Sequence, residues 1–285
     1  MCLLLLFINP NPRPGQYRLI VASNRDEFYG RPSKAAHWWE SHPDILSGTD
    51  QEKGKEGGTW LGMHKCGKMG FLLNVTEKDK SQDAKGRGSL VTDFLTGDAT
   101  VDEYLKSVAL QARDYDPFQL LLLENSTLGW NCSYFHKLHH TDPVSLEPGS
   151  YCVCNSRDPA KPWKKAEHAL SSFREVVDEY NSSQHRAALI SCLLNILRDD
   201  TSQLPDPNFE SCQSKHGIMD MLAQERLSAI FVKLPVYGTR THTLILVDLR
   251  MYCRIIWINE VPLVDDDIMH VNVKQGNISV CGPAI

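Results

Sequence analysis

The fold is decided at the start of the chain, where residues 2–27 read CLLLLFINPNPRPGQYRLIVASNRDE. Two apolar runs, residues 2–8 and 18–23, flank a segment that contains three prolines and Gly15. Short apolar runs separated by such turn residues predict a β-hairpin. The first run is too short to span a membrane and no basic region precedes it, which argues against a signal peptide. We therefore expect the N-terminus to lie inside a sheet.

After this hairpin, the sequence predicts a block of strands, a block of helices and a second block of strands. Alternating or β-branched runs predict strands at residues 59–63, 68–74, 118–124, 128–135, 228–234, 241–248 and 253–259. Apolar residues at intervals of three and four predict helices at residues 89–95, 100–112, 163–180 and 189–197. Thr100 is the expected N-cap of its helix, with Asp102 and Glu103 in the first turn. This order favours an α+β fold, a four-layer sandwich of two antiparallel sheets with outer helices.

Composition limits the class of protein. The chain has 285 residues, of which 42% are hydrophobic and 23% are charged, so it can bury a sizeable core. We expect a single domain over residues 1–285, with a loosely attached tail from about residue 263. The net charge of −5 is spread along the chain and offers no basic face for nucleic acid. The oligomeric state stays open.

The nine cysteines are an odd number without a paired framework, and no Cys-x-x-Cys or His-Glu-x-x-His spacing occurs. These features predict mostly reduced thiols and no metal site. With no export signal in the sequence, we expect a cytoplasmic protein that is not secreted.

Cys2 is the candidate nucleophile. Trimming of the initiator Met before a small second residue would leave one residue that carries both a thiol and a free α-amine. Such an amine has a pKa of about 7.7 to 8.0, so it can accept the thiol proton near neutral pH. The alternative is that Cys2 is a small apolar residue at the start of a strand.

Four polar residues, Asn24, Arg25, Asp26 and Glu27, follow the second strand of the hairpin. The hairpin returns them beside Cys2, where a carboxylate would hold the α-ammonium group. They are accordingly candidates for the polar rim of a ligand-binding site, and the alternative is a solvated loop.

Several motifs resemble those of the Transport and Golgi Organisation 2 family, which is also called the NRDE family. They are NRDEF at residues 24–28, RPS at 31–33, GKEGGTWLG at 54–62, LPDP at 204–207 and GTRT at 238–241, followed by the strand at 244–248. The resemblance implies a fold similar to N-terminal-nucleophile hydrolases. It also implies a location in cytoplasm, Golgi or mitochondria, and roles in secretory and Golgi organisation, lipid homeostasis and haem trafficking.

Through the implied fold, the chain also resembles bile-salt hydrolases and penicillin acylases. This likeness implies that Cys2 attacks an amide carbonyl, Asp26 steadies the α-amine, Asn74 holds the oxyanion, Asn155 positions the amine and Arg240 adds positive charge. The chain departs from those hydrolases at Ser23, where they have an arginine, and Arg25 is the residue that would substitute for it. The two asparagines also suit polar strand ends.

Three functions follow from these observations and the resemblance. The first is a carrier of an apolar small molecule, with haem or a fatty-acyl conjugate as the candidate cargo. The second is a Cys2-dependent amidohydrolase that acts on an amide or thioester of a lipid-like substrate. The third is a non-catalytic scaffold of the secretory pathway. Haem would need an iron ligand or an apolar slot that holds the macrocycle without one. The candidate ligands are His64, Cys66, His136, His139 and His140, and a loop or surface position is favoured over the ligand role for each of them.

Overall fold

The computed structural model describes residues 2–76, 84–126, 129–213, 221–249, 252–259, 268–274 and 277–281. The chain divides into two compact units. Unit 1 comprises residues 1–30, 148–156 and 160–285, and unit 2 comprises residues 31–147 and 157–159. Unit 2 is thus inserted in the sequence between parts of unit 1. The expectation of one domain over residues 1–285 stays a prediction.

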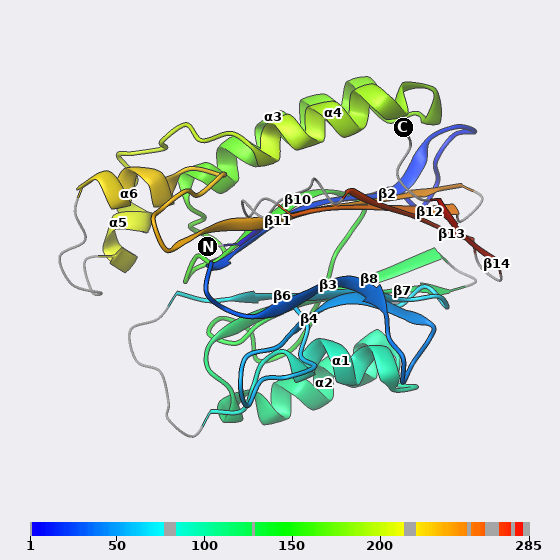
Figure 1. The fold of residues 1–285 in the computed structure, drawn as a ribbon, viewed down its shortest axis with the longest axis horizontal. Helices are drawn as coiled ribbons and strands as arrows, with labels where there is room; N and C mark the ends of the chain where they lie inside the picture. The colour runs from blue at the N-terminus through cyan, green and yellow to red at the C-terminus, as the bar shows by residue number, and fades with distance from the viewer. Residues whose placement is uncertain are drawn as a thin grey trace. The chain divides into compact units, whose positions relative to one another are not determined.

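Unit 1 is built on an antiparallel seven-stranded sheet in the order β10-β1-β2-β11-β12-β13-β14 (Figure 1). The strands are β1 (Leu3–Ile8), β2 (Tyr17–Phe28), β10 (Gly149–Cys154), β11 (Tyr237–Asp248), β12 (Tyr252–Asn259), β13 (Ile268–Lys274) and β14 (Asn277–Cys281). Strands β13 and β14 lie within the expected tail. The loose attachment of that tail stays a prediction.

The predicted N-terminal hairpin is confirmed. The amide of Asn9 donates to the carbonyl of Arg18 at 2.8 Å, and the chain turns at Gly15, whose φ of 89° suits glycine. Strand β1 pairs with β2 on one side and with β10 on the other. Leu3 to Leu6 are all buried, so β1 occupies the interior of its sheet.

Helices cover one face of this sheet. They are α3 (Lys164–Tyr180), α4 (Arg186–Leu197), α5 (Pro207–Gln213) and α6 (Met221–Ser228), with a short 3-10 turn η2 (Ser183–His185) before α4. In Figure 1, α3 and α4 run along the sheet. Phe173 and Val177 of α3 and Leu193 of α4 pack in one core with Leu3 and Leu5 of β1. Burial of this apolar surface is the main force that holds helices and sheet together.

Unit 2 has its own antiparallel sheet in the order β3-β4-β5-β6-β7-β8-β9. The strands are β3 (Ser33–Trp38), β4 (Ile45–Asp50), β5 (Leu61–His64), β6 (Met69–Asn74), β7 (Phe118–Ser126), β8 (Gly129–His136) and β9 (Val144–Ser145). Two helices, α1 (Ser89–Thr96) and α2 (Val101–Gln111), pack on this sheet, and η1 (Ala112–Asp114) follows α2. Phe94 and Leu105 meet Phe118 and Phe135 in the core of the unit.

The α+β class, with two antiparallel sheets and helices packed on them, is confirmed. The stacking of both sheets into one four-layer sandwich stays a prediction. The strand predicted at residues 228–234 is wrong, because α6 ends at Ser228 and the chain then runs without a strand to β11. The carbonyls of Ala229 and Ile230 in this connector accept hydrogen bonds from side chains, as described below, and the carbonyl of Val232 accepts from the amide of Thr239 in β11. Within the described ranges, no helix is both long and apolar enough to cross a membrane.

Candidate functional site

Cys2 lies immediately before β1, at an interior position of the unit 1 sheet. Its thiol donates a hydrogen bond to the backbone carbonyl of Asp26, with an Sγ to O distance of 3.8 Å. The register of the hairpin, which pairs Leu3 with Asn24, brings these residues together. The predicted proximity of Cys2 to the polar segment is therefore present in the structure. The expectation that this segment follows the second strand is wrong, because pairing with β11 extends β2 through Phe28, and the burial of Asn24, Arg25 and Asp26 rules out a solvated loop for them.

Strand β11 fixes Asp26 from the other side. One carboxylate oxygen, Oδ1, accepts a hydrogen bond from the hydroxyl of Thr239 at 2.6 Å. The same hydroxyl accepts from the amide of Val232 at 3.0 Å, so both its donor and its acceptor function are used. The phenol of Tyr237 donates to the Asp26 carbonyl at 3.4 Å. Asp26 is buried and thus held in one orientation next to the thiol.

Burial is the main electrostatic influence on Cys2. It raises the pKa of the thiol, and the Asp26 carboxylate raises it further. The N-terminal amine, the hydrogen bond to Asp26 and the guanidinium of Arg25 act in the opposite direction. Since the net effect on the pKa is upward, the thiol keeps its proton near neutral pH and needs a base in order to attack a carbonyl. Burial and Asp26 also raise the pKa of Tyr237, which stays a neutral hydrogen-bond donor.

Asn24 faces the interior of unit 1. Its side chain is fully buried, and Nδ2 donates to the carbonyls of Leu197 at 2.8 Å and Ile230 at 3.1 Å. Its Oδ1 lies 2.6 Å from Nδ1 of His242. These contacts tie β2 to α4, to the connector before β11 and to β11 itself. They indicate a structural role, and the predicted ligand-binding role of Asn24 stays a prediction.

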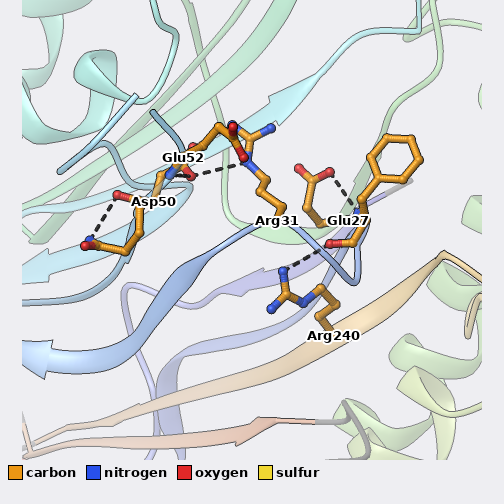
Figure 2. Close-up of polar contacts among 7 residues, drawn as sticks. Glu27, Arg31, Asp50, Glu52 and Arg240 are labelled. Carbon is orange, nitrogen blue, oxygen red and sulfur yellow. Dashed lines mark hydrogen bonds and ion pairs between the residues drawn. The ribbon is translucent and has the colours of Figure 1, made fainter. Parts of the chain in front are cut away.

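Arg25, Glu27 and Arg240 surround the end of β2. Arg25 is largely buried and close enough to Cys2 to lower the pKa of its thiol. Glu27 accepts from the amide of Phe28 at 2.9 Å, and Arg240 donates to the carbonyl of Phe28 at 3.2 Å (Figure 2). Ligand binding by Arg25 and Glu27, and the catalytic charge of Arg240, stay predictions.

The two candidate asparagines belong to different units. Asn155 is buried and follows β10, whose last residue, Cys154, pairs with Leu3. It therefore lies at the end of the sheet that carries Cys2. Asn74 is the exposed last residue of β6 in unit 2. The positioning role of Asn155 and the oxyanion role of Asn74 stay predictions.

Sequence reasoning missed Lys165, which is 1% exposed. Its Nζ donates to the carbonyls of Leu227 and Ala229, both at 3.0 Å. Burial lowers the pKa of the ammonium group, whereas Asp26 and nearby thiols, including that of Cys2, raise it. Lys165 thus places a buried amino group close enough to Asp26 and Cys2 to be influenced by their charges. The sequence feature that could have identified Lys165 as buried is its helical spacing. It lies four residues before Ala169 and eight before Phe173, which are both buried on the same helix.

The arrangement brings together the thiol of Cys2, the buried carboxylate of Asp26, the phenol of Tyr237 and the guanidinium of Arg25, with the buried amino group of Lys165 on α3 near them. Such a group suits nucleophilic attack on a carbonyl once a base removes the thiol proton. Across the described ranges, no three His, Cys, Asp or Glu side chains form a group that would hold a metal ion.

Comparisons with known proteins agree on a family. The sequence model of a family described as "Transport and Golgi organisation 2" matches residues 1–257. The human Transport and Golgi organization protein 2 homolog is 39% identical over 272 residues, covering 95% of this chain and 96% of that protein. The Drosophila melanogaster Transport and Golgi organization protein 2 is 31% identical over 259 residues, covering 87% and 88%.

Among solved structures, the chain is similar to a Caenorhabditis elegans protein described as an N-acylethanolamine-hydrolyzing acid amidase ortholog. That likeness has a TM-score of 0.41 at 12% identity, and it covers 67% of this chain and 85% of the other.

Proposed function

Since this chain belongs to the Transport and Golgi organisation 2 family, we propose that it takes part in the transport and Golgi organisation for which its relatives are named, through a thiol hydrolase site at Cys2. The substrate class is an amide or thioester of a lipid-like molecule. The observation that carries the proposal is the contact between the Cys2 thiol and the carbonyl of Asp26, whose carboxylate Thr239 holds. Action in the cytoplasm and at mitochondria stays a prediction.

The reaction follows from the position of the thiol. After removal of Met1, the α-amine of Cys2 accepts the thiol proton, and Sγ attacks the substrate carbonyl. The bond from carbon to sulfur forms, the bond from carbon to the leaving nitrogen or sulfur breaks, and the proton passes to the leaving group. Water then cleaves the acyl thioester and releases a carboxylic acid and the free thiol. In this proposal the charge of the Asp26 carboxylate stabilises the ammonium group that exists during this transfer.

The test is turnover of medium-chain N-acyl amides and acyl thioesters, followed by release of the amine or thiol. We expect Cys2→Ala and Asp26→Asn to reduce the rate at least about a hundredfold, the usual scale for loss of a nucleophile or its orienting group. Cys66→Ala is the matched control, because Cys66 is an exposed free thiol in unit 2. Unchanged turnover in Cys2→Ala would remove Cys2 from the mechanism.

One observation favours a second candidate function. The raised pKa of Cys2 leaves a neutral, unreactive thiol in any chain that keeps Met1, because the α-amine of Cys2 is then part of a peptide bond. Such a chain lacks the base for cleavage, and the second proposal is that it carries an apolar small molecule, haem or a fatty-acyl conjugate, as the family resemblance implies. Absence of turnover in the wild type, together with a ligand-induced rise in melting temperature that survives Cys2→Ala, would favour this carrier function.

A further inference from the structure

A short hairpin tip precedes β11 in unit 1. Lys233 bridges to Gly238, and the amide of Leu234 donates to the carbonyl of Tyr237 at 2.9 Å. These bonds leave Pro235 and Val236 at the turn, and the side chain of Val236 is 64% exposed.

The end of β2 adds an aromatic side chain to this turn. The amide of Tyr29 donates to the carbonyl of Val236 at 2.9 Å, and the ring of Phe28 meets that of Tyr237 edge-on with centroids 5.1 Å apart. Phe28 is nevertheless 56% exposed. We call Phe28, Pro235 and Val236 the tip patch. Exposed apolar side chains that gather on two neighbouring segments in this way are suited to contact another apolar surface.

Positive charge accompanies the tip patch. Lys233 is exposed at the base of the hairpin, and its carbonyl accepts a hydrogen bond from Nη1 of the exposed Arg226 at 3.2 Å. Glu27, which accepts from the amide of Phe28, and the exposed Glu225 beside Arg226 are acidic groups of this region, and Arg240, which donates to the carbonyl of Phe28, is a third cation. The chain as a whole carries a charge of −5, so any attraction to an anionic surface must come from such a local cluster and not from the net charge.

We propose that the tip patch docks unit 1 onto an anionic lipid surface. Phe28 and Val236 enter the boundary between headgroups and acyl chains, and Lys233 and Arg226 meet the anionic headgroups. The combination of exposed apolar side chains with adjacent cations favours a bilayer over an uncharged apolar partner.

The docked end is also the end that carries the thiol. Tyr237 connects the tip patch to the site. Its ring contacts Phe28, and its phenol donates to the carbonyl of Asp26, which also accepts from the thiol of Cys2. The substrate class that this arrangement admits is a long-chain acyl amide or acyl thioester taken from the bilayer. This last step rests on the proposed hydrolase function, whereas the docking does not.

Vesicle sedimentation tests the docking with the full chain. We expect binding to phosphatidylcholine vesicles that contain phosphatidylserine, weaker binding to phosphatidylcholine alone, and release by salt. Phe28→Asp and Val236→Asp should each weaken binding at least about tenfold, because each replaces an inserted apolar side chain with a charge. Lys233→Glu should weaken it at least roughly fivefold, on the scale of one cation near an anionic membrane.

A second exposed apolar and basic pair supplies the matched controls. Leu110, which is 83% exposed, and the exposed Lys106 lie four residues apart on helix α2 of unit 2. Leu110→Asp and Lys106→Glu should leave vesicle binding unchanged. Equal melting temperatures of all variants would show that each one folds.

Three results would overturn the docking. The first is wild-type protein that stays in the supernatant with phosphatidylserine vesicles, and the second is tip variants that bind as the wild type does. The third is a sedimentation velocity in the absence of lipid that falls from dimer to monomer in Val236→Asp, which would assign the tip patch to a second copy of the chain. Turnover of a soluble short-chain amide without vesicles reports on the hydrolase alone, so the two proposals fail separately.

Discussion

At Cys2, two charged neighbours act on one thiol with opposite sign. Burial and Asp26 raise the pKa of the thiol, and Arg25 lowers it. Arg25→Gln removes a lowering influence, so we expect the pKa to rise further and the fraction of thiolate at a given pH to fall. The rate at which iodoacetamide modifies Cys2, followed against pH by peptide mass spectrometry, should then reach its midpoint at a higher pH.

Arg13→Gln is the control for this titration, because Arg13 is an exposed guanidinium in the loop between β1 and β2. It should leave the midpoint where it is in the wild type. A midpoint that stays in place or falls in Arg25→Gln would mean that Arg25 does not stabilise the thiolate.

The sequence predicted the partners of Cys2 because they depend on a local feature. A hairpin of two apolar strands has few registers, and the native one returns the end of the second strand to the start of the first. The proximity of Cys2 and Asp26 follows from that alone. Lys165 could not be assigned in the same way, because a lysine in an amphipathic helix usually lies in solvent and its carbonyl partners lie more than 60 residues away, at separations of 62 and 64.

Helix α2 illustrates an element that local sequence specifies well. Thr100 was the expected N-cap, and the structure shows a capping box in which Thr100 and Glu103 each accept from the backbone amide of the other. Thr100→Ala should lower the free energy of unfolding by about 1 kcal/mol, the usual cost of losing a cap. Urea denaturation followed by circular dichroism measures this change.

Thr96→Ala, at the C-terminal end of the preceding helix α1, is the control for Thr100→Ala. Thr96 is exposed, and its hydroxyl donates to the carbonyl of Thr92 inside α1 without capping it. The substitution should change stability by less than about 0.5 kcal/mol. Equal losses in the two variants would show that the capping box does not contribute.

The connector at residues 228–234 shows where local patterning fails. Its run of apolar residues is typical of a strand, but a strand needs a neighbour to satisfy its backbone. Here the side chains of Lys165 and Asn24 donate to the carbonyls of Ala229 and Ile230. The apolar pattern of the sequence predicts which residues are buried, and this prediction is correct for Ala229, Ile230 and Val232. The pattern does not predict which groups form hydrogen bonds with the backbone.

For the whole molecule, the proposed hydrolase activity depends on whether the α-amine of Cys2 is free or part of a peptide bond. Strand β1 begins at Leu3, one residue after the thiol, and it lies between β10 and β2. A residue attached to Cys2 converts its α-amine into an amide, which cannot accept the thiol proton.

A removable N-terminal tag turns this into a test of the proposed hydrolase. The uncut protein should show at most about one hundredth of the turnover seen after cleavage that leaves Cys2 as the first residue, because only the cleaved chain has both nucleophile and base. The melting temperatures should agree, since the tag adds nothing to the core that β1 forms with α3 and α4. Carrying the same tag at the C-terminus controls for its bulk. Equal turnover before and after cleavage would show that the α-amine of Cys2 is not the base, and the thiol would then require another group to take its proton.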